Sequence, residues 1–276
     1  MTQTADLHIH TCFSDGVDTP QQVVSIALEK ELRCIAITDH DTLDAIEPAA
    51  AAAQGTGLEV IHGVELSTEC GGSDIHILGY CFDLHHHYLK EQLQLFRDAR
   101  VIRVKKMAER LRALGMEIDE EDIFSSAGTD AVGRPHVAQA IITRGYARTT
   151  AEAFEEYLAE GRPAYVAKYK QTPSDAIKLI RQAGGIAVIA HPMVTLKDEL
   201  IAGFVDEGLG GLEVYYPNTP RRLIVFYEKL AEKYGLIKTG GSDSHGRYRE
   251  YSPIGIARVD YAVVEALKDR AARLRP

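Results

Sequence analysis

Short apolar segments that end in histidine or a carboxylate recur along this 276-residue chain. In one of them, Cys34–Thr38 contains apolar residues and threonine and is followed by Asp39, His40 and Asp41. A short apolar run of this kind is typical of a strand buried on both faces of a parallel sheet. The pattern therefore favours an α/β fold whose polar residues gather at one edge of the sheet.

Helical patterns follow most of the apolar segments. Thr19 and Pro20, for example, provide an N-cap and a first helical residue ahead of the apolar positions Val23, Val24 and Ala27. We expect about seven strands, at Asp6–His10, Cys34–Thr38, Leu58–Val64, Ile75–Tyr80, Ile186–Ala190, Gly211–Tyr215 and Gly235–Thr239. This count predicts a parallel, barrel-like fold with its reactive groups at the carboxyl ends of the strands.

The strand pattern stops between about residues 90 and 165. One long helix is predicted over Tyr88–Gly115, and shorter helical patterns follow it. We therefore expect a barrel formed by residues 1–89 and 166–276, interrupted by a helical insertion over residues 90–165. The long helix is crowded with arginine and lysine, which form either a solvated face with ion pairs or a rim that attracts phosphate.

The composition argues against several classes of protein. A formal charge of −9 with 45% hydrophobic residues is typical of a soluble globular chain with a sizeable core. An acidic chain is a poor partner for duplex DNA. Without a leader pattern or an apolar run of bilayer length, we expect a cytoplasmic protein with no membrane contact, and no obligate protein partner is evident. The four cysteines are too widely spaced for a zinc ribbon or a disulfide framework.

His8 and His10 are separated by one residue in the first predicted strand. Because side chains two apart on a strand point the same way, both imidazoles leave one face together and form half of a metal site. Further histidines and carboxylates lie at or near the other strand ends. The full set is His8, His10, Asp15, His40, Glu65, His76, His191, Asp243 and His245.

This mixed set of nitrogen and oxygen ligands suits divalent first-row metals. Its nine members are too many for one ion, so we infer a cluster of two or three. Alternatively, each histidine is an ordinary core or surface residue. That alternative must hold independently at every strand end.

Several of these motifs together resemble the PHP family, the polymerase and histidinol phosphatase metallo-phosphoesterases. They are Asp6-x-His8-x-His10, Thr38-Asp39-His40-Asp41, Gly63-Val64-Glu65, Asp74-Ile75-His76-Ile77, Ala190-His191-Pro192 and Gly241-Ser242-Asp243-Ser244-His245. The likeness covers nearly the whole chain, and the helical region resembles the insertion of the nucleotide-directed bacterial branch. It implies a distorted seven-stranded (β/α)7 barrel with a site for up to three metals.

The resemblance also implies how the ligands are shared. One ion would take His8, His10, Glu65 and Asp243; a second would take Glu65 as a bridge with His76 and His191; a third would take Asp15, His40 and His245. Some family members have histidine where this chain has Asp15. A carboxylate at that position favours Mn²⁺ or Fe²⁺, with Zn²⁺ as the alternative.

Phosphoester hydrolysis follows from the charges of such a centre. Three divalent cations against three carboxylates leave an excess positive charge that attracts phosphate, and the metals can activate a water as nucleophile. Asp243, His40 and His245 are the candidate catalytic residues, and either histidine could protonate the leaving oxygen. A nucleophilic role for Cys12 is the unfavoured alternative, because no electropositive helix terminus is evident beside it.

Arg134 and His136 begin a helix within the predicted insertion. The nucleotide-directed members resemble the chain here, with an arginine and a histidine that hold substrate phosphate, and a guanidinium suits a phosphate through bidentate hydrogen bonds. Tyr215 and Tyr216 either stack on a base or pack at the rim. A further set of residues either extends the positive rim or belongs to the ordinary surface. This set is Lys168, Tyr169, Lys170, Arg247 and Arg249.

We expect a metal-dependent phosphoesterase that removes a phosphate from a small nucleotide, either a 3′,5′-nucleoside bisphosphate or the end of a short RNA. A phosphatase for a metabolite such as histidinol phosphate is the alternative among enzymes. A non-catalytic module that binds metal and nucleotide is the alternative outside them.

Overall fold

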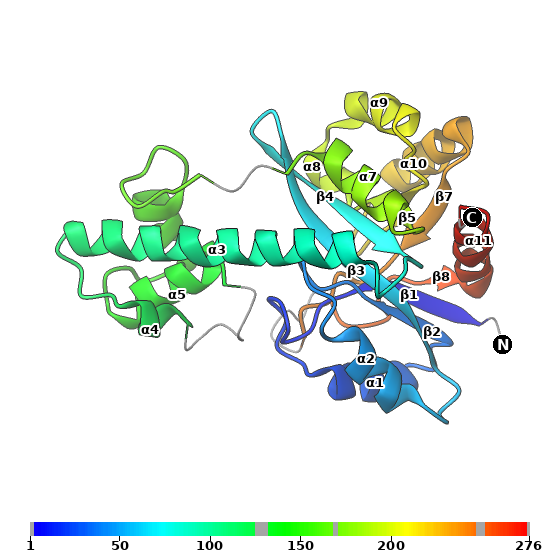
Figure 1. Cartoon of the computed structure of the whole chain (residues 1–276), viewed down its shortest axis with the longest axis horizontal. Coiled ribbons are helices and arrows are strands. Elements are labelled where there is room, and N and C mark those ends of the chain that lie inside the picture. The colour runs from blue at the N-terminus through cyan, green and yellow to red at the C-terminus, as the bar shows by residue number, and fades with distance from the viewer. Residues whose placement is uncertain (1–2, 125–131, 168–170, 247–251, 275–276) are drawn as a thin grey trace.

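The computed structural model describes residues 3–124, 132–167, 171–246 and 252–274. Within these ranges, eight strands form one curved sheet in the order β7-β6-β5-β4-β3-β2-β1-β8, and helices surround it (Figure 1). The strands are β1 (Thr4–Ile9), β2 (Cys34–Ile37), β3 (Glu59–Cys70), β4 (Ser73–Tyr80), β5 (Ile186–Ile189), β6 (Gly211–Tyr215), β7 (Ile237–Gly240) and β8 (Val259–Asp260). The predicted barrel-like α/β fold is confirmed.

The sheet nearly closes because the chain after β7 returns to β1. Ile9 forms a parallel bridge with Ser244, and the backbone N–H of His10 donates to the Ser244 carbonyl at 2.8 Å. Gly241 makes this approach possible, since a Cβ there would lie 2.3 Å from the backbone nitrogen of His8. The first and last metal-ligand motifs of the chain thereby become neighbours.

Two strands depart from the predicted parallel sheet. β4 pairs antiparallel with both β3 and β5, and the short β8, which was not predicted, pairs antiparallel with β1. Gly71 and Gly72, both with positive φ, turn β3 directly into β4. A parallel pair needs a crossover of a dozen or more residues, and this connection has two.

Two apolar clusters hold the helices against the sheet. One joins the strands to α1, α2, α7, α9 and α10, and the other joins β1, β2, β4 and β5 to α11. These helices and their short neighbours are α1 (Pro20–Glu29), α2 (Ile46–Ala53), α7 (Pro173–Gln182), α8 (Pro192–Thr195), the 3₁₀ helix η2 (Asp198–Leu200), α9 (Ile201–Asp206), α10 (Arg221–Tyr234) and α11 (Tyr261–Ala272).

The long helix α3 (His87–Ala113) extends away from the barrel to a group of short helices (Figure 1). Its first turns pack on the barrel through Leu89, Leu93 and Phe96, whereas Val104 and Leu111 belong to a separate apolar cluster. The elements around that second cluster are α4 (Glu120–Phe124), α5 (Arg134–Thr143), α6 (Thr150–Ala153) and the π-helix η1 (Phe154–Leu158). One helix therefore spans two apolar cores.

Among the described residues, none of the helices combines the length and the apolar composition needed to cross a membrane.

Candidate metal centre

Four side chains meet at one point near the carboxyl end of β1. Nε2 of His8 lies 3.2 Å from Nε2 of His10, 3.2 Å from Oε2 of Glu65 and 3.4 Å from Oδ1 of Asp243. Nε2 of His10 lies 3.1 and 3.2 Å from the same two oxygens. Ligands held about 2.0–2.1 Å from a tetrahedral ion are separated by about 3.3 Å, so this donor set fits a metal ion.

The sheet brings these residues together from distant parts of the chain. His8 and His10 leave the end of β1, and Asp243 follows β7 in a left-handed conformation with φ of 50°. Glu65, in contrast, lies in the middle of β3, because β3 continues to Cys70 instead of ending at Val64. The prediction of a strand end at Val64 was wrong. The extension lifts the β3–β4 hairpin out of the barrel and carries His76 with it.

Glu65 lies at the centre of the histidines. Its Oε1 contacts Nδ1 of His76 at 2.8 Å and Nε2 of His191 at 3.1 Å, and its Oε2 lies 3.4 Å from Nδ1 of His40. His76 reaches Glu65 because it pairs with Ser67, two residues along the same face of β3. The three residues expected around the second ion are thus in contact, and a ligand atom of His40 also lies within 4.8 Å of those of Glu65 and His76.

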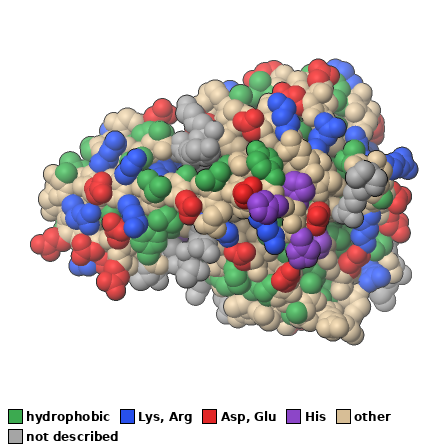
Figure 2. Space-filling view, in the orientation of Figure 1, with side chains coloured by type: hydrophobic (Ala, Val, Ile, Leu, Met, Phe, Trp, Pro, Cys, Tyr) green, Lys and Arg blue, Asp and Glu red, His purple; other side chains and the backbone are tan. Residues whose placement is uncertain are grey.

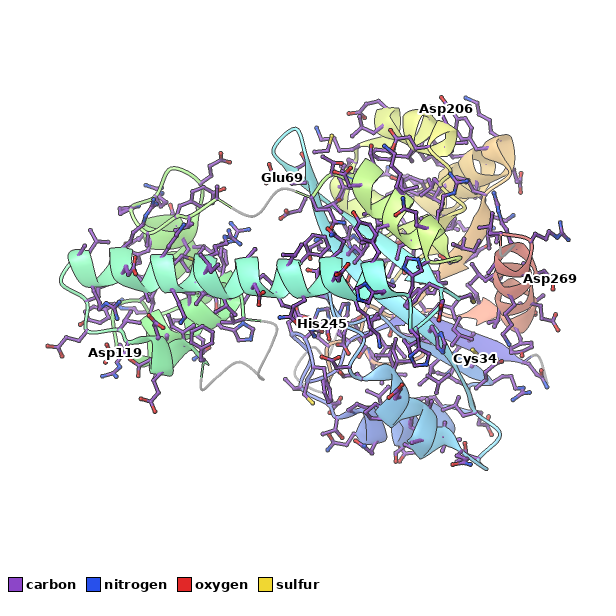
Figure 3. The ribbon with its side chains drawn as sticks, in the orientation of Figure 1. Cys34, Glu69, Asp119, Asp206, His245 and Asp269 are labelled. Carbon is purple, nitrogen blue, oxygen red and sulfur yellow. The ribbon has the colours of Figure 1, made fainter. Side chains whose placement is uncertain are left out.

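A third group forms around Asp15. Its Oδ2 lies 3.2 Å from Nε2 of His245 and 3.9 Å from Nε2 of His40. His10 joins the group through Nδ1, at 3.6 Å from Oδ1 of Asp15. All nine predicted ligand residues therefore lie around one centre. Figure 3 labels His245, on the side of the barrel beneath α3. The histidine side chains visible at the surface in Figure 2 lie near the first turn of α3, whereas the ligand histidines of the centre are at most 21% exposed.

Hydrogen bonds at Nδ1 determine which nitrogen of His8 and of His245 faces the other ligands. Nδ1 of His8 contacts Oε1 of Glu213 at 2.9 Å, and Nδ1 of His245 contacts the Asp243 carbonyl at 2.9 Å. Since neither oxygen can donate, each Nδ1 carries the proton, and each Nε2 faces the other ligand atoms of its group. Within the described part of the chain, Nδ1 of His40 and of His191 are buried and have no hydrogen-bond partner. Buried nitrogens without partners are costly unless an ion or a water binds them.

The pKa values of the acidic side chains favour the ionised forms. Burial raises the pKa of Glu65, but the imidazoles of His40, His8 and His76 outweigh it and hold that pKa well below the ordinary value. Burial likewise raises the pKa of Asp243, and His8 and His10 lower it overall. Anionic oxygens are what a divalent cation requires.

The histidines differ in their protonation. Burial lowers the pKa of His10, but hydrogen bonds to Asp243 and Glu65 outweigh it and raise that pKa to about 10. Burial lowers the pKa of His40 to about 3. In the absence of metal the centre therefore holds protons on some imidazoles, and metal binding must displace them.

Sequence analysis missed the carboxylates that support the ligands. Glu213 is fully buried in β6, where Oε1 accepts from Nδ1 of His8 and Oε2 accepts from the His191 backbone N–H at 2.7 Å. Asp39 accepts from the backbone and hydroxyl of Thr11 and from Ser14, and so holds the loop that carries Asp15. A charged residue within an otherwise apolar strand, as in Gly211–Tyr215, was the signal for Glu213.

A cavity of about 210 Å³ opens between the centre and the insertion. Asp15, His40 and His76 line one side of it, and Arg103 and Arg134 line the other. The Arg134 guanidinium lies 5.5 Å from the ring centre of Phe154 and 3.9 Å from Asp74. This arrangement places a cation beside the candidate ligands.

His136 has the geometry of a helix cap. Its Nδ1 accepts the Gly133 backbone N–H at 3.1 Å, so the neutral ring carries its proton on Nε2. Burial lowers the pKa of His136, which keeps the ring neutral. The predicted rim residues Lys168, Tyr169, Lys170, Arg247 and Arg249 lie outside the described residues.

The two tyrosines at the end of β6, Tyr215 and Tyr216, point in different directions. The Tyr215 hydroxyl donates to Glu228 on α10, away from the centre, and the Tyr216 hydroxyl donates to Oδ2 of Asp243 at 2.9 Å. These contacts favour packing at the rim over stacking on a base. Burial and Asp39 raise the pKa of Cys12, which argues against a thiolate nucleophile there.

Comparisons with known proteins agree with this centre. Residues 6–100 match the model of the PHP domain. The chain is 34% identical to a 5′-3′ exoribonuclease of Haemophilus influenzae, over 89% of this chain and 91% of that one. It is 32% identical to a 3′,5′-nucleoside bisphosphate phosphatase of Chromobacterium violaceum, over 87% and 86% of the two chains.

A solved structure from Bifidobacterium adolescentis, described as that of a candidate metal-dependent phosphoesterase, superimposes with a TM-score of 0.86. The two chains are 30% identical, and the match covers 97% of this chain and 96% of the other.

Proposed function

The chain belongs to the PHP family and is a metal-dependent phosphoesterase, and we propose that it removes a phosphate from a small nucleotide. The substrate would be a 3′,5′-nucleoside bisphosphate or the end of a short RNA, as the names of the two relatives suggest. Family membership decides against the non-catalytic alternative.

The convergence of His8, His10, Glu65 and Asp243 carries this proposal. Five separations of 3.1 to 3.4 Å between their ligand atoms fit one ion, and Glu65 extends the same centre to His76 and His191. We assign Asp15, His40 and His245 to a third ion. When bound, the ions would supply an activated water and positive charge for the phosphoryl oxygens.

The residues around the centre would bind and orient the substrate. Arg134 would pair with a phosphate through two guanidinium N–H groups, and His136 would donate from Nε2. Both residues begin α5, so the N-terminal backbone of that helix faces the same anion. Where the third ion is not bound, His40 and His245 are the candidates for protonating the leaving oxygen, since both lie within 4 Å of Asp15 beside the cavity.

We further propose that residues 90–165 act as a cover for the centre attached to a barrel formed by residues 1–89 and 166–276. The separate apolar cluster of the insertion and its cavity-lining arginines support this division. For the metals we propose Mn²⁺ or Fe²⁺ over Zn²⁺, because the third group contains the carboxylate of Asp15.

Phosphate release from a substrate panel tests the proposal. The purified protein, stripped with chelator and reloaded with Mn²⁺, Fe²⁺ or Zn²⁺, would be assayed with 3′,5′-nucleoside bisphosphates, nucleoside monophosphates, 5′-phosphorylated short RNA and histidinol phosphate. We expect the highest kcat/KM with a nucleotide that carries a second phosphate in addition to the phosphate that is removed. A preference for histidinol phosphate would contradict the substrate assignment, and equal activity after chelation would contradict the metal assignment.

A further inference from the structure

β6 supplies no ligand to the centre, yet β6 and the residue that follows it contact three ligands, His8, His191 and Asp243. Glu213 on this strand supports His8 and His191, as described above. The ladder between β6 and β7 continues past its last strand residue, because the Gly241 N–H donates to the Tyr215 carbonyl at 3.1 Å. This pairing sets Tyr216 beside the turn that carries Asp243.

The contacts of Tyr216 give the two oxygens of Asp243 separate partners. Oδ2 accepts from the Tyr216 hydroxyl at 2.9 Å, whereas Oδ1 lies 3.4 and 3.2 Å from the Nε2 atoms of His8 and His10. The Tyr216 ring also meets the ring of His191, with centres 5.6 Å apart at 65°. One side chain therefore touches a ligand of the first group and a ligand of the second.

Asp243 needs such support because of its backbone. Its φ of 50° lies in the left-handed region, which non-glycine residues adopt rarely. A carboxylate on such a turn can rotate to present either one oxygen or both. The hydrogen bond from the Tyr216 hydroxyl to Oδ2 favours the orientation in which Oδ1 faces His8 and His10.

We propose that Tyr216 is a positioning residue that holds Asp243 so that Oδ1 alone faces the metal. The inference rests on the proposed function, since it assumes that Asp243 binds an ion. Outer hydrogen-bond partners of metal ligands typically contribute 10- to 100-fold to metal affinity. Tyr216 would contribute through the hydroxyl and would leave phosphate binding at Arg134 unchanged.

The test compares Tyr216→Phe with Tyr215→Phe. Both variants lose a tyrosine hydroxyl that donates to a carboxylate, but the partner of Tyr215 is Glu228 on the outer helix. We expect Tyr216→Phe to lower Mn²⁺ affinity, measured by competition with a chelator, by about 10-fold or more. Tyr215→Phe should bind Mn²⁺ as the wild type does. At saturating Mn²⁺, Tyr216→Phe should lower kcat without raising KM.

A double-mutant cycle with Asp243→Asn separates positioning from general stability. If Tyr216 acts through Asp243, Tyr216→Phe should cost no further Mn²⁺ affinity in the Asp243→Asn background. An equal loss in both backgrounds, or no loss in the wild type, would overturn the inference. If Asp243→Asn itself left Mn²⁺ affinity unchanged, the proposed metal assignment would fail instead.

Discussion

A single buried carboxylate decides how His8 presents its ligand nitrogen. Glu213 accepts a hydrogen bond from the Nδ1–H of His8 and so fixes Nε2 as the atom that faces Glu65 and Asp243. The same carboxylate accepts a hydrogen bond from the backbone N–H of His191, the residue that precedes α8 and has a φ of 30°. Its two oxygens thus orient two ligands at once.

Glu213→Gln should therefore weaken the metal centre. The glutamine amide has the same size as the carboxylate, but one of its two positions is an NH₂ group that cannot accept a hydrogen bond. Either Nδ1–H of His8 or the backbone N–H of His191 would therefore lose its acceptor. We expect an affinity for Mn²⁺ about 10- to 100-fold lower, measured by chelator competition. Glu228→Gln, which removes a carboxylate partnered by Tyr215, is the matched control and should leave the affinity unchanged. Wild-type affinity in Glu213→Gln would contradict this role.

Arg134→Ala should affect the substrate and leave the metal in place. A hydrogen bond to a charged group contributes about 1.5–3 kcal/mol, so we expect kcat/KM to fall by about 10- to 100-fold. Arg144 at the other end of α5 pairs with Asp122 and provides the control, since Arg144→Ala should leave kcat/KM unchanged. Metal analysis of both variants completes the test. Loss of metal from Arg134→Ala would show that the arginine supports the centre instead.

The ligands found from the sequence lie within or just after a predicted strand. His40, His191 and Asp243 each come just after a strand and so stood out. Glu213 and Tyr216 could not be assigned in this way, because their roles depend on which ligand each one meets across the sheet. Such contacts come from the pairing of β6 with its neighbours, which no local pattern encodes.

At the scale of elements, the length and direction of the β3–β4 hairpin were not predicted from the sequence. The apolar run predicted an end at Val64, yet β3 continues through Glu65 to Cys70. Leu66 and Thr68 are buried and alternate with more polar positions, a pattern typical of an antiparallel strand. The alternation was present in the sequence, but the expectation of a parallel sheet concealed it.

A buried ion pair connects α3 to the loop of His40. Arg100 pairs with Asp41 and donates to the Ser67 hydroxyl at 2.7 Å, and Asp41 accepts from the Ser67 backbone N–H. The Arg100 and Asp41 side chains are 18% and 3% exposed. This pair therefore joins the insertion to the two segments that provide His40 and Glu65.

Arg100→Ala should destabilise the protein strongly. Removing one partner of a buried pair costs about 3 kcal/mol or more, measured as the free energy of unfolding in urea. Arg97, one turn earlier, pairs with Asp44, whose side chain is 48% exposed. Arg97→Ala should therefore lower the free energy of unfolding by about 1 kcal/mol or less. If both variants lost the same free energy of unfolding, the ion pair of Arg100 with Asp41 would not have the stability of a buried pair.

A second contact between elements predicts a dependence on pH. Burial raises the pKa of Glu59, but hydrogen bonds from Lys268 and Tyr261 on α11 outweigh it and lower that pKa below 4.5. Because the folded pKa is below the unfolded one, ionised Glu59 stabilises the fold above about pH 4.5, and the contribution is lost as pH falls further.

The free energy of unfolding should therefore differ most between wild type and Glu59→Gln at neutral pH, and the difference should shrink below about pH 4.5. Measurements in chelator keep the metal centre out of the comparison. Glu232→Gln, which removes an exposed pair with Lys238, should differ little from the wild type at any pH. A constant difference for Glu59→Gln would contradict the lowered pKa.

At the scale of the whole molecule, metal binding should stabilise the fold. The ligands come from β1, β3, β4 and the segments after β2, β5 and β7, so bound ions would hold most of the barrel together. A ligand present at 100 times its Kd adds about 2.7 kcal/mol to the free energy of unfolding. Mn²⁺ should raise the thermal midpoint by several degrees in the wild type and less in Asp243→Asn. No shift in the wild type would contradict a centre that binds in the folded state.

The barrel could be predicted from its alternating strands and helices, because each β/α unit has a local pattern. The near closure could not, since it depends on Gly241 fitting against His8 across more than two hundred residues. Likewise, the helical pattern of α3 was visible, whereas the change of packing partner between Phe96 and Val104 was not.

That change of partner has a mechanical consequence. α3 contains neither glycine nor proline, so its 27 residues form a stiff rod about 40 Å long that has no built-in hinge. Its first turns are held where Leu89 and Phe96 pack on the barrel and where Arg97 and Arg100 pair with Asp44 and Asp41. A tilt of about 5° there would sweep the distal end by about 2 Å, because roughly 20 Å of rod lies beyond Arg100.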